Sequence, residues 1–243
     1  MSEPAHSVLI DKRVVVTRPV HQQTDLVEAL HIEGAIPVPL PLIDIVEIPA
    51  GVSDLRSLLA DAENLSWIVV TSPNGARVVS MLHEDGCVLP PVAALGAATA
   101  EAIGHSVEFI SSRAVAAALV DEFPNGIGSV VVVQGDLADP TLTSGLAAKG
   151  WNVNRCDVYR TIDTEPTHDE LSDALDADAV VLASGSAARN WARLTGGDFT
   201  GEVVVIGPVT AAAAHEAGLH VSAVADTPTV PGMIDALAAA LSP

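Results

Sequence analysis

The feature that most constrains this chain is an alternation, over its whole length, of short β-branched runs with Ala- and Leu-rich amphipathic segments. Apolar runs of this kind are buried on both faces, as in parallel sheets that are covered by helices. The expected strands are residues 13–17, 67–71, 92–95, 107–110, 130–133, 179–183, 203–206 and 221–224. The pattern therefore predicts an α/β fold with parallel sheets.

The segments between the strands predict ten helices, several of which end at a glycine, as is typical of a C-cap. The expected helices are residues 24–33, 53–63, 74–83, 98–104, 114–122, 142–149, 169–175, 186–194, 209–217 and 231–241. The terminal glycines are Gly34, Gly104, Gly150 and Gly218. Because hydrophobic residues make up 49% of the chain and aromatic residues only 3%, we expect a core of Val, Leu, Ile and Ala.

An internal repeat organises these elements. One unit has a strand ending near Ser72 and a glycine turn ending at Thr99, and its copy has a strand ending near Ser184 and a turn ending at Thr210. A second unit, strand–helix–Gly–strand, begins at residues 14–17 and again at residues 131–134. The units alternate along the chain, and each half alone would form a small doubly wound sheet.

The four pieces can pair into domains sequentially, or in an interleaved way that builds one domain from both ends of the chain. Residues 36–48 and 151–163 are 13-residue extended stretches, about 43 Å long at ~3.3 Å per residue, whereas ordinary strands have ~5–6 residues. We expect each stretch to leave its own sheet and cross to the other domain, which favours the interleaved arrangement.

The interleaved arrangement gives two doubly wound, flavodoxin-like α/β domains joined by a two-stranded β connection. The first domain comprises residues 1–39 and 164–243, the second comprises residues 46–157, and the connection is formed by residues 40–45 and 158–163.

Four turns follow a strand and open a helix: residues 71–75, 96–99, 183–186 and 207–210. Small and hydroxyl residues there serve as N-caps in any βα turn. However, these turns form two matched pairs at the carboxyl ends of strands, where open α/β sheets bind ligands, and helix N-termini favour anions. We therefore expect at least two of them to contact a ligand. None matches G-x-G-x-x-G or a P-loop.

Composition excludes several partners. The net charge is −20, from 31 acids against 11 bases, which argues against nucleic acid and against an anionic membrane surface. No apolar run approaches the ~20 residues of a spanning helix, and the first ten residues do not resemble a secretory signal. The two cysteines, which we expect to be reduced and buried, have no metal-binding spacing. We expect a cytoplasmic protein without a metal.

Few side chains suggest catalysis on their own. The histidines are scattered singly, and we expect Asp169, Asp173, Asp176 and Asp178 to form a solvated acidic helix edge. Tyr159 is the only tyrosine and lies on the second long extended stretch. Its phenol can donate a proton to a leaving group, although residue type alone favours simple packing.

Five motifs in order resemble the uroporphyrinogen-III synthase family. They are Val-Val-Val-Thr-Arg-Pro at 14–19, Thr-Ser-Pro-Asn at 71–74, Leu-Gly-Ala-Ala-Thr-Ala at 95–100, Asp-Val-Tyr-Arg-Thr at 157–161 and Ile-Gly-Pro-Val-Thr-Ala at 206–211. The chain departs from the family pattern at Ala-Ser-Gly-Ser (183–186), where Thr-Ser-Pro is common, and at Gln134 to Asp136, where an arginine is frequent.

The resemblance implies two α/β domains with a two-stranded connection and a lyase that needs no cofactor. Its substrate would be hydroxymethylbilane, a linear tetrapyrrole with eight carboxylates, in the biosynthesis of haem, sirohaem and cobalamin. Loss of the terminal hydroxyl as water gives an azafulvene cation. Attack by the last pyrrole ring gives a spiro intermediate, and the macrocycle then closes with that ring inverted.

The resemblance also implies roles for individual residues. Tyr159 matches the family tyrosine and is the candidate proton donor. The substrate-binding candidates are Thr17, Arg18, Ser72, Asn74, Gly96, Thr99, Ser184, Ser186, Gly207 and Thr210. We expect helix N-termini to dominate carboxylate binding, with help from nearby arginines, and we expect a monomer. The alternative is a non-catalytic tetrapyrrole sensor of the same fold.

Overall fold

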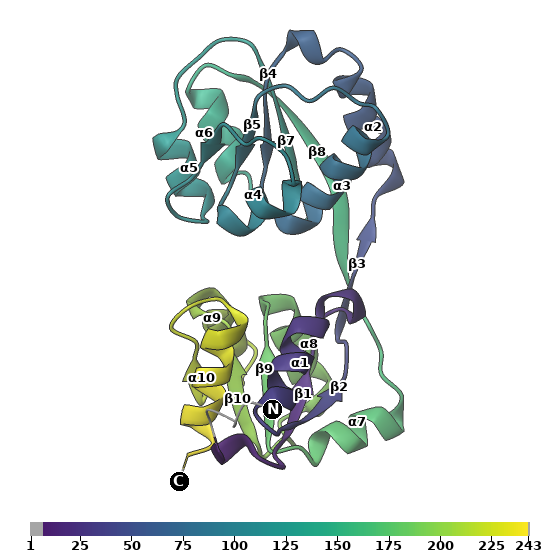
Figure 1. Ribbon diagram of the computed structural model, residues 1–243, viewed down its shortest axis with the longest axis vertical. Coiled ribbons are helices and arrows are strands. Elements are labelled where there is room, and N and C mark those ends of the chain that lie inside the picture. Colours follow the sequence, from purple (N-terminus) through teal and green to yellow (C-terminus); the bar gives the residue numbers. More distant parts are fainter. Residues whose placement is uncertain (1–6, 243) are drawn as a thin grey trace. The chain divides into compact units, whose positions relative to one another are not determined.

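A computed structural model describes residues 7–242 of the chain (Figure 1). The chain divides into two compact units. Unit 1 comprises Met1–Asp44 and Ile162–Pro243, and unit 2 comprises Ile45–Thr161. Each unit contains a sheet with helices on both faces, so the predicted two-domain α/β fold is confirmed. The assignment of residues 40–45 and 158–163 as a two-stranded connection stays a prediction.

The sheet of unit 1 has five parallel strands in the order β11-β10-β9-β1-β2. They are β1 (Arg13–Val16), β2 (Ile36–Pro39), β9 (Ala179–Leu182), β10 (Glu202–Val205) and β11 (Ala223–Val224). This is the flavodoxin-like order. The direction in which strands are added reverses between β1 and β9, which places the expected ligand position at the carboxyl ends of these two strands.

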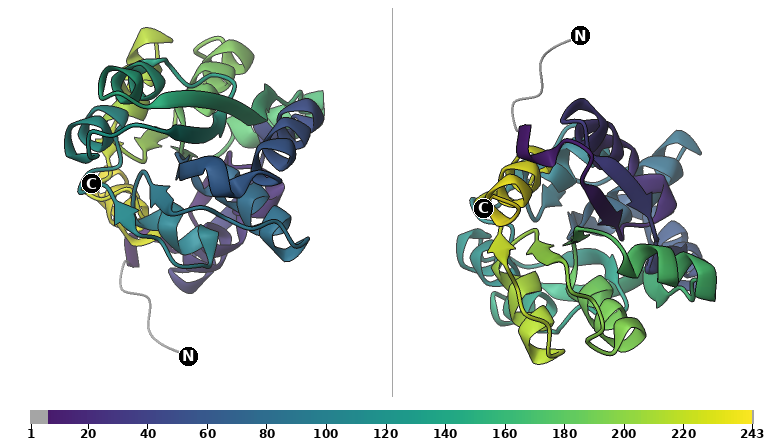
Figure 2. Two further views of the ribbon diagram at one scale, coloured as in Figure 1. Left: turned by 90° about the horizontal axis from the view of Figure 1, so that it is seen from above. Right: turned by 90° about the horizontal axis from the view of Figure 1, so that it is seen from below.

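Helices cover both faces of this sheet because successive strand residues point to opposite sides. Val14 and Val16 pack toward α1 (Thr24–Ile32) and α10 (Val230–Ala240), whereas Val15 packs on the other side. The other side is covered by α7 (His168–Leu175), α8 (Gly185–Thr195) and α9 (Pro208–Glu216). Two 3-10 turns complete the unit, η1 (Ser7–Leu9) and η2 (Val20–Gln22). The right-hand view of Figure 2 shows α1 and α10 on one side of the strands and α8 and α9 on the other.

The sheet of unit 2 has the order β3-β8-β7-β4-β5-β6. Its strands are β3 (Ile43–Glu47), β4 (Leu65–Val70), β5 (Val92–Ala94), β6 (Phe109–Ile110), β7 (Ser129–Gly135) and β8 (Asn152–Asp163). The expected flavodoxin-like order therefore holds for unit 1 only. In unit 2 the strands β5 and β6 are added on one side of β4, and β7 and β8 are added on its other side. The reversal lies between β4 and β7.

The helices of unit 2 also form two layers. Ile68 and Val70 of β4 pack with α2 (Pro49–Leu59), α3 (Pro73–Glu84) and α4 (Ala97–Ile103). Val69 of the same strand packs on the opposite side, against α5 (Ala116–Glu122) and α6 (Thr141–Ala148). The turn η3 (Ala62–Asn64) precedes β4. As expected, aliphatic residues dominate both layers.

Residues 36–48 leave one sheet for the other, as expected, but they do not form one continuous strand. The stretch forms β2 and β3, which belong to different sheets, with Leu40 and Leu42 buried in unit 1 between them. Pro37 and Pro39 lie within β2, an edge strand, and Pro41 lies between the two strands, where its missing N–H removes no ladder bond. The second stretch does form one 12-residue strand, β8.

Element ends agree with the sequence pattern to within a few residues, except at α2. This helix begins at Pro49 and ends at Leu59, instead of covering residues 53–63. Proline suits the first turn of a helix, where its missing N–H has no intrahelical partner. The glycines expected at helix ends, Gly34, Gly104, Gly150 and Gly218, all have positive φ, as C-cap residues do.

Two further expectations need correction. Asp178 is not a solvated residue of a helix edge, because its Oδ1 accepts from Lys12 Nζ at 2.8 Å and its Oδ2 accepts from the backbone N–H of Arg13 at 2.9 Å. Cys156 is buried as expected, but Cys87 is only half-buried, and both thiols are free.

Within residues 7–242, no helix is long and apolar enough to cross a membrane.

Candidate functional site

Each unit has a pocket at the point where its strand order reverses. In unit 2 a cavity of about 250 Å³ opens at the carboxyl ends of β4 and β7. In unit 1 a cavity of about 200 Å³ opens beyond β1 and β9. The sequence repeat predicted this correspondence, since these strand pairs hold the matched turns at residues 71–75 and 183–186.

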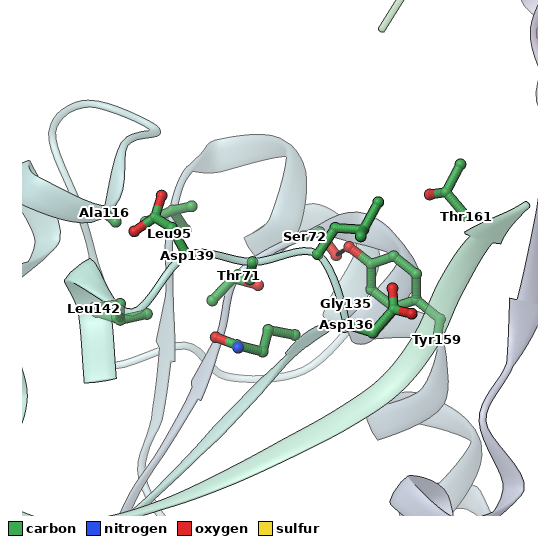
Figure 3. A pocket seen from close by; sticks show the side chains of 13 residues that line it. Thr71, Ser72, Leu95, Ala116, Gly135, Asp136, Asp139, Leu142, Tyr159 and Thr161 are labelled. Atoms are coloured by element: carbon green, nitrogen blue, oxygen red, sulfur yellow. Dashed lines mark hydrogen bonds between the residues drawn. The ribbon is translucent and has the colours of Figure 1, made fainter. Parts of the chain in front are cut away.

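The pocket of unit 2 contains the candidate catalytic tyrosine. Figure 3 shows Ser72 and Tyr159 together at one end, with Leu95, Asp139 and Leu142 toward the other. The complete lining is Thr71, Ser72, Leu95, Ala116, Gln134, Gly135, Asp136, Leu137, Ala138, Asp139, Leu142, Tyr159 and Thr161. The pocket thus combines an apolar wall with hydroxyl groups and two carboxylates.

Ser72 is the N-cap of α3. Its backbone is extended (φ −155°, ψ 158°), and its Oγ accepts a hydrogen bond from the backbone N–H of Gly75 at 3.1 Å. Pro73 occupies the first turn, where proline is favoured. Ser184 caps α8 with nearly the same backbone geometry (φ −157°, ψ 157°), accepting from Ala187 N–H at 3.2 Å. The two serines are therefore equivalent structurally as well as in sequence.

Tyr159 distinguishes the two turns. Its phenol oxygen lies 2.9 Å from Ser72 Oγ in a hydrogen bond in which either atom can donate. The side chain is half-buried and packs against the core layer around α3. Burial raises the pKa of the Tyr159 phenol, the Ser72 hydrogen bond opposes this rise, and the Asp136 carboxylate adds to it. The phenol therefore carries its proton at neutral pH.

A β-bulge orients Tyr159 toward this pocket. Along the β7–β8 ladder Gln134 pairs with Asp157, but the next residue, Gly135, pairs with Tyr159, so that Val158 is the extra residue. Cys156, Val158 and Tyr159 consequently all pack on the same core layer, although strict alternation would send Tyr159 to the other face. Bulges next to active sites commonly redirect a side chain in this way.

Gly135 allows the Tyr159 ring to lie where it does. A Cβ on Gly135 would lie 2.8 Å from Cε2 and Cζ of the ring, and 3.1 Å from the phenol oxygen. Real Cβ atoms essentially never lie within 3.0 Å of another atom, so any other residue at this position would displace the ring. Glycine is required at position 135 because the Tyr159 ring occupies the space into which any side chain would project.

The charged side chains lining the unit 2 pocket are both acidic. Asp136 follows β7 directly, and its backbone N–H donates to the Tyr159 carbonyl oxygen at 3.1 Å. Asp139 lies one turn further along the same loop and is exposed. A pocket whose described lining has two carboxylates and no cation suits a neutral or cationic group better than a substrate carboxylate.

The pocket of unit 1 has the opposite charge. It is lined by Thr17, Arg18, Pro19, Gln22, Ile43, Ala183, Ser184 and Ala187, next to the N-terminus of α8. Arg18 Nη2 lies 3.9 Å from the Met233 sulfur, a weak acceptor, and Arg18 Nε is buried with no partner among the described residues. Burial lowers the pKa of the Arg18 guanidinium, and nearby Asp25 opposes the change. Arg18 is the one charged residue in the described lining of this pocket.

Thr17 has a structural bond as well as a place in the unit 1 pocket. Its hydroxyl is fully buried and donates to the Val181 carbonyl oxygen at 2.8 Å, which ties β1 to β9.

The remaining predicted binding residues do not line these two pockets. Asn74 Oδ1 accepts from Arg77 at 2.7 Å, and Ser186 Oγ accepts from Arg189 at 3.5 Å. Thr99 and Thr210 are buried in the first turns of α4 and α9. Gly96 and Gly207 cap the same two helices.

The two capping glycines have different reasons to be glycine. A Cβ on Gly96 would lie 2.8 Å from the Ala114 Cβ, so packing explains this residue. A Cβ on Gly207 would meet nothing within 4 Å, and its φ of 173° is extended backbone that any residue adopts. The fold does not require glycine at 207, which leaves close approach of a ligand as a reason for it.

Gly135 and Asp136 line the unit 2 pocket, although the sequence analysis noted their loop only as a departure from the family pattern and did not include them among the binding candidates. The repeat held the necessary signal, because residues 14–17 correspond to residues 131–134, so that Gln134 is the counterpart of Thr17 and Gly135 that of Arg18. The repeat therefore indicates that the ends of β1 and β7 have equivalent positions. Within residues 7–242, His, Cys, Asp and Glu side chains form no group of three or more arranged to hold a metal ion.

The chain is similar in sequence to known proteins. Residues 24–235 match the model of a family described as uroporphyrinogen-III synthase HemD. The chain is 30% identical over 246 aligned positions to the chloroplastic uroporphyrinogen-III synthase of Oryza sativa subsp. japonica, covering 94% of this chain and 80% of the relative.

Two solved structures are similar in fold. A mutant uroporphyrinogen III synthase from the extremely thermophilic bacterium Thermus thermophilus has a TM-score of 0.67 at 20% identity, covering 95% of this chain and 98% of that one. A uroporphyrinogen-III synthetase from Helicobacter pylori 26695 has a TM-score of 0.61 at 17% identity, covering 95% of this chain and all of that one.

Proposed function

Because this chain belongs to the uroporphyrinogen-III synthase HemD family, we propose that it acts on hydroxymethylbilane and that Tyr159 donates the proton that removes the hydroxyl group. Its activity is that of a uroporphyrinogen-III synthase, a hydro-lyase of tetrapyrrole biosynthesis.

The first step breaks the bond between the terminal carbon of the substrate and its hydroxyl oxygen. The electron pair leaves with the oxygen, the Tyr159 proton joins it to form water, and the charges left behind are an azafulvene cation and a phenolate. When the last pyrrole ring attacks the cation, the ring nitrogen loses a proton, which can return to the phenolate. The net reaction releases one water. A side chain that donates a proton to the departing hydroxyl group accelerates the breaking of the carbon–oxygen bond by general acid catalysis.

One observation carries the assignment of Tyr159: its phenol lines a pocket at the strand reversal of unit 2 and is hydrogen-bonded to Ser72 at 2.9 Å. Burial keeps the phenol protonated, as a proton donor must be. The carboxylates of Asp136 and Asp139 in the same pocket favour a cationic intermediate there. They also disfavour a substrate carboxylate, so the carboxylates of the substrate are expected to bind elsewhere.

The unit 1 pocket is the proposed carboxylate site. Arg18 supplies a guanidinium that lines this pocket, and Ser184 marks the N-terminus of the 11-residue helix α8. A helix N-terminus contributes about +0.5 charge, and a guanidinium pairs with carboxylates through two parallel hydrogen bonds. This local charge is compatible with the net charge of −20, because exposed charges are screened beyond ~8 Å at physiological salt.

The test is to incubate the purified chain with hydroxymethylbilane and separate the uroporphyrinogen isomers. We expect isomer III at a rate above that of the uncatalysed closure, which yields isomer I. Accumulation of isomer I alone at the uncatalysed rate would overturn the proposal and leave the non-catalytic sensor. A monomer, a cytoplasmic location and the lack of a cofactor stay predictions.

A further inference from the structure

Ser72 forms two hydrogen bonds that restrict what its hydroxyl can do. A serine hydroxyl has one proton and two lone pairs. One lone pair accepts from the Gly75 N–H at 3.1 Å, and the group also bonds the Tyr159 phenol at 2.9 Å. While Tyr159 is protonated, either hydroxyl can be the donor in the second bond.

Loss of the Tyr159 proton leaves only one direction for this bond. A phenolate has no proton to give, so the Ser72 hydroxyl must donate to it across the same 2.9 Å. If Ser72 already donates before the reaction, the Tyr159 proton is free to point toward the leaving hydroxyl. The Ser72 hydroxyl can then donate to both the phenol and the phenolate of Tyr159, so neither group has to change its partner.

The electrostatic surroundings of Ser72 strengthen this role. The helix that it caps, α3, is 12 residues long, and its first N–H groups carry partial positive charge. The Gly75 N–H polarises the Ser72 hydroxyl, which makes it a better donor. Tyr159 otherwise has unfavourable surroundings for a phenolate, namely burial and the Asp136 carboxylate. Asp136 and Asp139 are the charged side chains of the surrounding pocket.

We infer that Ser72 is a positioning residue: it holds the Tyr159 phenol and donates a hydrogen bond to the phenolate, instead of binding a substrate carboxylate. This inference rests on the proposed role of Tyr159 as proton donor. It differs from the role that the family resemblance implied for Ser72. It also separates Ser72 from Ser184, whose equivalent cap stands beside Arg18 in the other pocket.

The experiment compares Ser72→Ala, Ser72→Thr, Tyr159→Phe and the double variant Ser72→Ala/Tyr159→Phe. We expect Ser72→Ala to lower kcat roughly 10- to 100-fold, the cost of a hydrogen bond to a charged group, with a smaller change in KM. Ser72→Thr keeps the hydroxyl and should restore most of kcat. In the Tyr159→Phe background, Ser72→Ala should lower kcat little further.

A direct readout comes from the tyrosine itself. Tyr159 is the only tyrosine in the chain, so the absorbance change on tyrosinate formation reports one group. Because the Ser72 bond lowers the pKa of Tyr159, its loss in Ser72→Ala should move this titration to higher pH. Thr229→Ala is the matched control, since Thr229 caps α10 through the N–H three residues on, at 3.2 Å. It should lose similar helix stability and leave both kcat and the titration unchanged.

Two results would overturn the inference while leaving the role of Tyr159 intact. One is an unchanged tyrosine titration in Ser72→Ala, and the other is an equal loss of kcat from Ser72→Ala with and without the Tyr159 phenol, which would indicate direct contact with the substrate. A Tyr159→Phe variant with wild-type kcat would overturn both the tyrosine assignment and this inference. Continued production of isomer III would then show that the synthase activity itself stands.

Discussion

Gly135 and Tyr159 pair across the β7–β8 ladder so closely that a Cβ at position 135 would lie 2.8 Å from two ring carbons of the tyrosine. The bulge at this point brings the ring onto the glycine backbone and the phenol within 2.9 Å of Ser72. The location of the candidate acid thus depends on a residue that has no side chain of its own.

Gly135→Ala should displace the Tyr159 ring and lower kcat by roughly 100-fold, since a misplacement of ~1 Å can cost that much. Steady-state kinetics together with urea unfolding checks this expectation. Gly145→Ala is the matched control: its Cβ would lie 2.5 Å from Val120, in the same unit but outside the pocket lining. It should be destabilised and keep kcat once folded. Equal kcat values for the two variants would contradict the positional role of Gly135.

Gly207→Ala tests whether a ligand approaches α9. The fold leaves the new Cβ in open space and the backbone is extended, so the free energy of unfolding should change by less than about 0.5 kcal/mol. We expect KM to rise with the fold intact. Gly201→Ala provides the contrast, because its Cβ would meet the Asp178 carbonyl oxygen at 2.6 Å and should destabilise unit 1. An unchanged KM in Gly207→Ala would remove Gly207 from the binding residues.

Asp136→Asn should change the pH dependence of kcat. The Asp136 carboxylate raises the pKa of the Tyr159 phenol in addition to the larger effect of burial, so its neutralisation should lower that pKa. A proton donor loses activity as pH rises through its pKa, and the basic limb of the kcat profile should therefore move to lower pH. Asp139→Asn, in the same pocket, should leave the limb in place. Identical profiles for all three proteins would disprove the coupling.

The Asp178 carboxylate should stabilise unit 1 at neutral pH and lose this effect in acid. The hydrogen bond from Lys12 is the main cause that lowers the pKa of the Asp178 carboxyl in the folded chain. The carboxylate therefore contributes fully to the free energy of unfolding above the pKa of an unfolded aspartate, ~3.9, and this contribution is lost as pH falls through the pKa of the folded state. Since both side chains are about one-third exposed, we expect Asp178→Asn to cost only about 1 kcal/mol at neutral pH.

Urea unfolding at several pH values measures this difference, which should narrow below about pH 4. Asp176→Asn, a neighbouring exposed carboxylate, should change the free energy of unfolding by less than about 0.5 kcal/mol. A difference that persists in acid would mean that the Asp178 charge is not what stabilises unit 1.

Local patterns predicted what depends on local physics. Apolar runs predicted the buried strands, terminal glycines predicted the C-caps, and the repeat predicted that Ser72 and Ser184 have equivalent positions. The edge position of β2 was also within reach, because alternating prolines cannot continue a ladder on both edges.

The decisive contacts of the site could not be read in this way. Ser72 and Tyr159 are 87 residues apart, and their hydrogen bond depends on a register shift of one residue between β7 and β8. A bulge has no unique sequence signature, and simple alternation would have turned Tyr159 to the opposite face. The sequence pattern did not predict the pairing of Asp178 with Lys12 either, because the two residues are 166 positions apart in the chain and meet only in the folded sheet.

The measurement that tests the role of Tyr159 most directly is the kcat and KM of Tyr159→Phe with hydroxymethylbilane, with the product isomer determined in the same assay. Phenylalanine keeps the ring on Gly135 and removes only the phenol oxygen that bonds Ser72. We predict a kcat lower by about 100-fold or more, the lower range for general acid catalysis, with KM nearly unchanged. A wild-type kcat for isomer III would contradict the assignment of Tyr159 as the proton donor.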